Sequence, residues 1–229
     1  ILDIVRTNPK TKTIHFGGLA GARIRANYMK LVYKEVAQDG TSALKKLFPR
    51  ITEGTQFHTF HHQEGLLYAT QFTQPALTLM EVAAYRYLSE KGLVKHGAAF
   101  AGHSLGEYAA LAAVGDVLTI EGMVDITFYR GMTMQNTVSR DSQGRSNYGM
   151  CAVNPQRVGR GFSHQALQYV VDTIASKSHG LLEIVNYNVW EWQYVVTGEL
   201  LSLDALCLVL NYIKSKNLNL GQILQEQSL

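Results

Sequence analysis

The sequence has little cysteine, proline and charge, and each shortage excludes a class of protein. Its 229 residues include two cysteines, four prolines and 17% charged residues, against 46% apolar residues. This apolar content excludes an intrinsically disordered chain and suffices for one or two domains with a packed core. Cys151 and Cys207 lie far apart and lack metal-ligand spacing. They are expected to be reduced core thiols, which favours a cytoplasmic protein over a secreted one.

Long hydrophobic runs, clustered positive charge and a signal segment are also missing. No apolar run approaches the roughly 18 residues that cross a bilayer, so a membrane span is excluded. The net charge is only +3 and the basic residues are scattered, so no nucleic-acid partner is expected. His58, His61 and His62 are not accompanied by carboxylates or thiols at ligand spacing, so no metal is expected. The chain begins with Ile rather than Met, and it is expected to be cut from something longer.

Periodic apolar residues predict a mainly helical first part with one buried strand. Helices are expected at residues 22–36, 43–48, 75–92, 107–114 and 120–135. Pro75 would open the third helix, and Thr119 would cap the last. The expected apolar face of the third helix consists of Leu77, Met80, Ala84 and Leu88. The run at 98–101 predicts a buried strand that leads into a turn at 102–106.

A polar, glycine-containing stretch at residues 140–148 reads as a linker, and the order of elements changes after it. Strands are expected at residues 149–154, 181–187 and 194–197, and helices at 163–176 and 203–214. This β-α-β-β-α order is one strand short of a ferredoxin-like unit. The sequence therefore predicts two domains, at residues 1–145 and 146–229, the second ending in a polar tail.

Residues 100–107 read FAGHSLGE and place a G-x-S-x-G motif between the predicted strand and helix. A nucleophile elbow needs this context, because its sharp turn projects the serine hydroxyl at the start of the following helix. Ser104 is the candidate nucleophile, and the backbone N–H of Leu105 is the candidate oxyanion donor. Gly102 and Gly106 would leave room for the turn, while His103 would be a packed, hydrogen-bonded residue pointing away from the serine. A plain tight turn between strand and helix is the alternative.

Two further motifs lie on either side of the elbow motif in the sequence. TQPAL precedes it at residues 73–77, and YRGMTMQ follows it at 129–135. With these motifs the sequence resembles the acyltransferase family that includes malonyl-CoA:acyl carrier protein transacylases. The longer stretches FTQPALTLME, FAGHSLGEYAALA, FYRGMTMQ and GRSNYGM are similar to the malonyl/palmitoyl transferase domain of the fungal type I fatty acid synthase beta subunit. The resemblance covers essentially the whole chain.

The resemblance implies an α/β fold with an α/β-hydrolase-like acyltransferase core and a ferredoxin-like α+β subdomain, both incomplete. Ser104 would carry the acyl group as an ester between two thiol carriers. Arg130 stands where malonyl-selective members keep an arginine, since a guanidinium can hold a carboxylate through two parallel hydrogen bonds. A structural salt bridge with a core Asp or Glu is the alternative for Arg130. Asn188 would line the cleft between the domains, although strand-end asparagines are often turn residues.

The implied substrates are malonyl-CoA and palmitoyl-CoA, and the implied partners are acyl carrier protein and the remainder of a large multi-domain synthase. Coenzyme A and acyl carrier protein bring phosphopantetheine thioesters, and the segment itself needs no cofactor. The family's base histidine and the glutamine of its second oxyanion donor have no counterpart here, because His164 and His179 stand in the wrong context. The chain alone is therefore expected to be inactive, since base assistance is worth about 10²–10⁴-fold.

Two other functions remain open from the residues. An α/β-hydrolase such as a thioesterase or lipase also uses G-x-S-x-G, but it would place further β-α units, an acid and a histidine after the serine. A non-catalytic scaffold module of a polyketide or fatty acid synthase is the second alternative. The intact Ser104 and Arg130 argue against it.

Overall fold

The computed structural model describes residues 1–36, 41–114, 117–141 and 143–219. The chain divides into two compact units, Ile1–Val138 and Ser139–Leu229. The domain boundary that the sequence places at residues 145–146 stays a prediction, and the last ten residues of the predicted tail lie outside the described residues. In the part of the chain that the structure describes, no helix is both long and apolar enough to cross a membrane.

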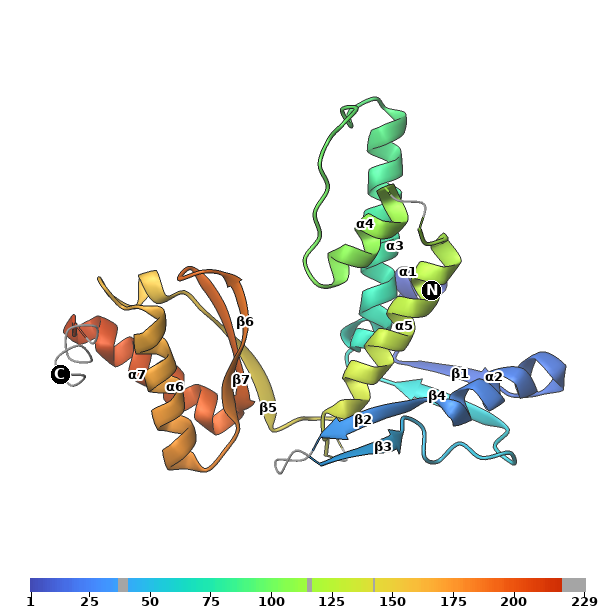
Figure 1. Cartoon of the computed structure of the whole chain (residues 1–229). Helices are drawn as coiled ribbons and strands as arrows, with labels where there is room; N and C mark the ends of the chain where they lie inside the picture. The colour runs from blue at the N-terminus through green and yellow to red at the C-terminus, as the bar shows by residue number, and fades with distance from the viewer. Residues whose placement is uncertain (37–40, 115–116, 142, 220–229) are drawn as a thin grey trace. The chain divides into compact units, whose positions relative to one another are not determined.

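The first unit combines helices with two small antiparallel sheets (Figure 1). Its helices are α1 (Leu2–Thr7), α2 (Gly18–Lys30), the 3-10 turn η1 (Leu66–Tyr68), α3 (Thr70–Glu90), α4 (Leu105–Val114) and α5 (Ile120–Thr137). Its paired strands are β1 (Thr11–His15) with β4 (Phe57–His61), and β2 (Val32–Val36) with β3 (Ser42–Lys46). The predicted cap of α5 is confirmed, because the Thr119 hydroxyl accepts a hydrogen bond from the Gly122 N–H.

Helix α3 packs against β4, α4 and α5. Its Phe72 ring packs edge-on against Phe60 of β4 and Phe128 of α5, at centroid distances of 5.3 and 5.6 Å. Gly131 lets α5 approach α3 closely, since a Cβ there would lie 2.5 Å from the Cα of Gln71. Val82 joins α3 to a second cluster that includes residues of α4 and α5. Ala109 and Ala112 of α4 and the middle of α5 thus both pack near one helix.

Three of the elements predicted for this unit differ in the structure. The helix expected over 22–36 ends at Lys30, and the short helix expected over 43–48 is strand β3 instead. Strands β2 and β3 pair with each other, and this pairing satisfies backbone groups that a single short helix satisfies poorly. The buried strand expected over 98–101 is also wrong, because Phe100 is 42% exposed and the segment joins no described ladder. A buried strand needs neighbouring strands to hold its backbone.

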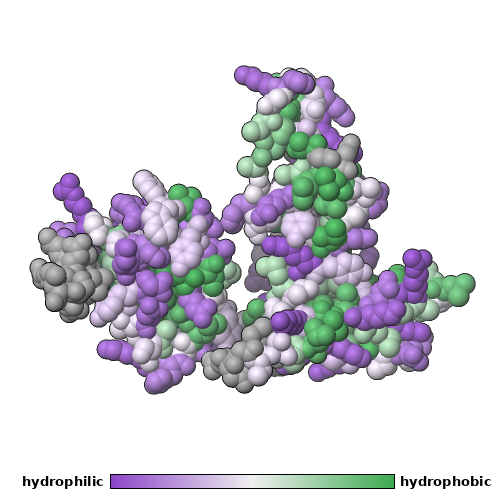
Figure 2. All heavy atoms as spheres, viewed as in Figure 1, coloured by the Kyte–Doolittle hydropathy of each residue, from purple (hydrophilic) through white to green (hydrophobic). Residues whose placement is uncertain are grey.

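The predicted apolar face of α3 is wrong as well. Leu77, Met80 and Leu88 are 42%, 56% and 43% exposed. The buried side chains are instead the stripe that faces α5 and α4, namely Gln71, Phe72, Gln74, Pro75, Thr78 and Val82. Pro75 lies inside α3 rather than at its first position. Figure 2 shows hydrophobic side chains on the exposed surface of the first unit.

The second unit is a three-stranded antiparallel sheet with two helices on one face (Figure 1). Its elements are β5 (Tyr148–Val153), the 3-10 turn η2 (Pro155–Arg157), α6 (His164–Ser178), β6 (Leu182–Val189), β7 (Gln193–Glu199) and α7 (Leu200–Lys216). The strand order is β5-β7-β6, so β5 and β6 are edges of the described sheet. The predicted β-α-β-β-α order is confirmed. Its core is formed by side chains of the three strands and both α-helices, among them Val153, Leu167, Leu182, Tyr194 and Leu206.

Candidate active site

The turn that carries Ser104 has the backbone of a strained elbow. Ser104 has a backbone φ of 54°, which lies in the left-handed region that residues other than glycine rarely adopt. A Cβ on Gly102 would overlap the backbone of Gly106, whereas a Cβ on Gly106 would meet nothing. The two glycines therefore differ in role, because only Gly102 must be a glycine for the turn to close. The serine is exposed at the end of this turn.

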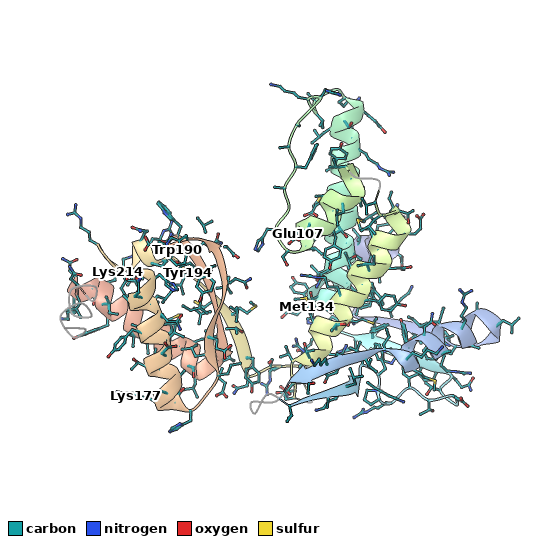
Figure 3. All side chains as sticks on the ribbon, in the orientation of Figure 1. Glu107, Met134, Lys177, Trp190, Tyr194 and Lys214 are labelled. Atoms are coloured by element: carbon teal, nitrogen blue, oxygen red, sulfur yellow. The ribbon has the colours of Figure 1, made fainter. Side chains whose placement is uncertain are left out.

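Helix α4 begins directly after the serine and places its first amides at the site. The Glu107 carboxylate accepts a hydrogen bond from the Ser104 N–H at 3.1 Å, which ties the elbow to the first helical turn. Leu105 is the first residue of α4, and its N–H lies among amides that have no partner within the helix. Such amides stabilise negative charge on a neighbouring oxygen. Figure 3 labels Glu107 at this end of α4.

Arg130 reaches the serine from α5. Its Nη2 donates a hydrogen bond to the Ser104 Oγ at 2.8 Å, and its Nη1 donates to the Gln74 Oε1 at 2.7 Å. The guanidinium also lies 5.6 Å from the centre of the Tyr108 ring, which faces it from α4. The structure thus brings together the two residues that the sequence singled out as nucleophile and carboxylate ligand, 26 positions apart.

Gln74 is a residue of the site that sequence reasoning missed. It is 4% exposed, and its Nε2 donates to the Thr70 Oγ1 at 2.8 Å and to the Met134 Sδ at 3.3 Å. These bonds fix its amide so that Oε1 faces Arg130. The available signal was its place in the TQPAL motif, immediately before Pro75, because a polar side chain that is buried on a helix needs a hydrogen-bond partner.

The partners of Arg130 leave its charge uncompensated. In the described part of the chain, the guanidinium contacts an amide, a hydroxyl and a ring, and forms no ion pair with Asp or Glu. This finding disfavours the structural salt bridge that the sequence left as an alternative. A half-buried guanidinium with neutral partners can bind a carboxylate that arrives with a ligand.

A groove of about 510 Å³ runs behind the elbow, between α3, α4 and the segment before the serine. Its lining includes Leu77 and Tyr85 of α3, Phe100, and His103, which is exposed. Its walls are mainly apolar, because α4 contributes alanines. The exposed face of α3 is therefore one wall of this groove.

Two methionines of α5 differ in burial: Met123 is fully buried in the first unit, whereas Met134 is 47% exposed and contacts Gln74 (Figure 3). Other residues considered from the sequence lie away from the elbow or stay untested. Asn188 lies on β6 of the second unit, so its place at the cleft stays a prediction. His58 packs against aromatic rings, and no three His, Cys, Asp or Glu side chains within the described ranges are grouped as metal ligands.

Known sequences and structures were compared with this chain. Residues 1–224 match the acyl transferase domain family. Fatty acid synthase subunit beta of Schizosaccharomyces pombe is 54% identical over 223 residues, which is 97% of this chain and 11% of that protein. The subunit of the same name from Saccharomyces cerevisiae is 53% identical over 229 residues, 100% of this chain and again 11% of that protein. The chain therefore spans about a tenth of the length of these relatives.

Two solved structures resemble the fold of the chain. A malonyl-CoA:acyl carrier protein transacylase from Xanthomonas oryzae is 28% identical with a TM-score of 0.51, over 64% of this chain and 42% of that one. A malonyl transacylase solved in complex with a type II polyketide synthase acyl carrier protein is 26% identical with a TM-score of 0.52. That match covers 73% of this chain and 46% of the other. Both matches confirm the predicted α/β acyltransferase fold.

Proposed function

The chain belongs to the acyl transferase domain family, and from this premise we propose that it transfers malonyl groups between coenzyme A and acyl carrier protein through an ester on Ser104. The observation that carries the proposal is the pair formed by Ser104 and Arg130. A guanidinium that forms no ion pair with an acidic side chain among the described residues lies 2.8 Å from the candidate nucleophile. Malonyl differs from other short acyl groups by its carboxylate, which such a guanidinium recognises with two parallel hydrogen bonds.

The proposed reaction has two halves of the same kind. The Ser104 oxygen attacks the thioester carbonyl, the Leu105 N–H stabilises the oxyanion, and the coenzyme A thiol leaves. The thiol of acyl carrier protein then attacks the resulting ester and releases Ser104. An unassisted serine hydroxyl is a weak nucleophile near neutral pH. We assign the base to a histidine of the longer protein that is not among the 229 residues of this chain, as the family motif implies, and His164 and His179 receive no role.

Arg130 would hold the malonyl carboxylate in both halves. Its hydrogen bond to the Ser104 hydroxyl exists without substrate, so the carboxylate of a bound malonyl group would replace this bond. Gln74 would keep the other edge of the guanidinium in place. Palmitoyl transfer, which the resemblance suggests, would require Arg130 to swing aside and an apolar surface to accept the chain. The remainder of a large cytosolic synthase would supply the other reactions.

The proposal is tested in a chimeric subunit, in which the chain replaces the matching 223 residues of the S. pombe relative. Malonyl-CoA is added without acceptor, and peptides are mapped by mass spectrometry. We expect a malonyl ester on Ser104, its loss in Ser104→Ala, and no change in Ser89→Ala, which alters an exposed serine of α3. A malonyl adduct of equal yield in Ser104→Ala would overturn the assignment.

Transfer is distinguished from hydrolysis with the same chimera. Holo acyl carrier protein is added, and malonyl-carrier and free malonate are quantified together. We expect malonyl-carrier to be the main product, because a transferase must exclude water from the ester. Free malonate as the main product would favour the thioesterase alternative. The isolated chain serves as a negative control, because the sequence predicts that it is inactive by itself.

A further inference from the structure

The two cysteines of the chain meet in the second unit. Cys151 lies on the edge strand β5 and Cys207 on helix α7, and their Sγ atoms are 3.9 Å apart. The sequence suggested two distant core thiols, and this is wrong for Cys207, which is exposed. Cys151 is half-buried and packs against the core of the unit. Strand β5 and helix α7 therefore present a pair of thiols, one of them open to solvent.

A small pocket of about 180 Å³ surrounds the pair. Its lining includes both cysteines, the cationic side chains of Arg157 and Lys214, and Asn154. Figure 3 labels Lys214 on α7. The Asn154 Oδ1 is buried and has no hydrogen-bond partner within the described residues. The pocket thus combines two sulfurs, two nearby positive charges and an unused hydrogen-bond acceptor.

The two thiols differ in reactivity. Burial raises the pKa of Cys151, and the neighbouring Cys207 raises it further. Cys207 is exposed, so its sulfur is accessible to an oxidant in solution. We therefore expect an oxidant to react first with Cys207. Cys151 is close enough to attack the oxidised Cys207 sulfur in a second step.

We propose that Cys151 and Cys207 form a reversible dithiol–disulfide site whose oxidant is a hydroperoxide. The Cys207 thiolate attacks one peroxide oxygen, so that an S–O bond forms, the O–O bond breaks and the leaving oxygen takes a proton to become water or an alcohol. The Cys151 thiolate then attacks the Cys207 sulfenic acid, an S–S bond forms, and water leaves.

The geometry favours an internal bond over other products. A disulfide needs a sulfur–sulfur distance of about 2.05 Å, so the two atoms at 3.9 Å must approach by roughly 2 Å. Both side chains can rotate toward each other, because the pocket leaves space around them. The bond would join the first strand of the second unit to its last helix, across 56 residues of sequence. Such a link restricts the unfolded chain and raises the temperature of unfolding.

The test uses the purified protein treated with hydrogen peroxide and then freed of it. We expect both thiols to be lost to a thiol reagent, the mass to fall by about 2 Da, and dithiothreitol to restore both. Digestion without reductant would yield one peptide pair that contains Cys151 and Cys207. The unfolding temperature would rise on oxidation in the wild type, but not in Cys207→Ser or Cys151→Ser.

Several results would overturn the proposal. Sulfinic acid on Cys207 with Cys151 still reduced would show that the thiols do not react together. Covalent dimers as the main oxidised product would show that the bond forms between chains. A disulfide-linked peptide that persists in either serine variant would show that the remaining cysteine bonds to another molecule. The site is independent of transfer at Ser104, so its failure would leave the proposed function untouched.

Discussion

At the scale of single residues, the orientation of Arg130 depends on a buried amide. Gln74 accepts one hydrogen bond from the guanidinium at 2.7 Å and is itself held by Thr70. A hydrogen bond to a charged group contributes about 1.5–3 kcal/mol. We therefore expect Gln74 to be a positioning residue, which acts on substrate only through Arg130.

Replacing Gln74 tests this role. In the chimeric subunit, Gln74→Leu is expected to lower kcat/KM for malonyl-CoA by about 10- to 100-fold, because the loose guanidinium holds the carboxylate less well. The fall should appear mainly in KM, while kcat/KM for palmitoyl-CoA changes little. Gln71→Leu is the matched control, since Gln71 is also buried on α3 but makes no described contact with Arg130. Equal losses for both acyl groups would contradict the positioning role.

A second residue-scale prediction concerns His58 and pH. Its ring lies 4.6 Å from Phe60 and 5.2 Å from Phe48, and burial lowers its pKa below the ordinary 6.5. The unfolded chain therefore binds a proton more readily than the folded one between these pKa values. The contribution of His58 to stability is full above about pH 6.5 and is lost as the pH falls through its lower folded pKa.

The measurement is the thermal unfolding midpoint at about pH 7.5 and about pH 5.5. We expect the wild type to lose more stability on acidification than His58→Leu, which cannot titrate at this position. His61→Leu changes an exposed neighbour on the same strand and should behave like the wild type. If His58→Leu and the wild type lose equal stability on acidification, protonation of His58 does not lower the stability of the folded protein.

The sequence predicts candidate reacting groups but not the contacts between them. Ser104 and Arg130 were singled out by motif, because their chemistry is local to short patterns. Their hydrogen bond could not be predicted, since it depends on α4 and α5 both packing on α3. Gln74 was missed for the same reason, because its function arises only when α5 brings a guanidinium to its side chain.

At the scale of elements, the elbow depends on one close backbone approach. Gly102→Ala would place a methyl group against the backbone of Gly106, which cannot move without opening the turn. We expect malonyl transfer in the chimera to fall by more than tenfold, and stability by about 1–3 kcal/mol. Gly106→Ala is the matched control, because its new methyl group meets nothing within 4 Å.

Transfer rates and urea unfolding of the two alanine variants provide the comparison. A Gly102→Ala protein that transfers malonyl as fast as Gly106→Ala would show that the turn has room for a side chain. Ser104 would then lie on a loop that is less tightly packed than the elbow described above.

Element prediction succeeded where local signals and tertiary packing agree. Helix α5 has a threonine cap, and the second unit shows alternating strands and periodic helices that close into their own sheet and core. It failed at residues 98–101, where an apolar run predicted a buried strand that no described strand accompanies. It also failed for α3, because a helix with apolar residues around most of its surface has no single face that sequence can identify.

At the scale of the whole molecule, each unit has its own core. The cluster around Tyr194 and Leu206 contains only residues of the second unit, and the clusters around Phe72 and Met123 contain only residues of the first. Residues 139–229 should therefore fold alone and unfold cooperatively in urea. In this segment, Leu206→Ala should cost about 2–5 kcal/mol, because its side chain is fully buried.

Leu208→Ala provides the matched control for that experiment. Leu208 lies on the same helix but is 71% exposed, so its replacement should change stability by less than about 0.5 kcal/mol. An unfolded segment 139–229, or equal costs for the two leucines, would contradict the independence of the second unit.

The central claim is that Arg130 holds the carboxylate of an acyl group carried by Ser104. The most direct test measures kcat/KM for malonyl-CoA and for palmitoyl-CoA in the chimera, with and without Arg130→Ala. The account predicts that malonyl transfer falls by roughly 10- to 100-fold, as expected when a charge-assisted pair is lost, while palmitoyl transfer falls far less. Equal losses for the two substrates would contradict it.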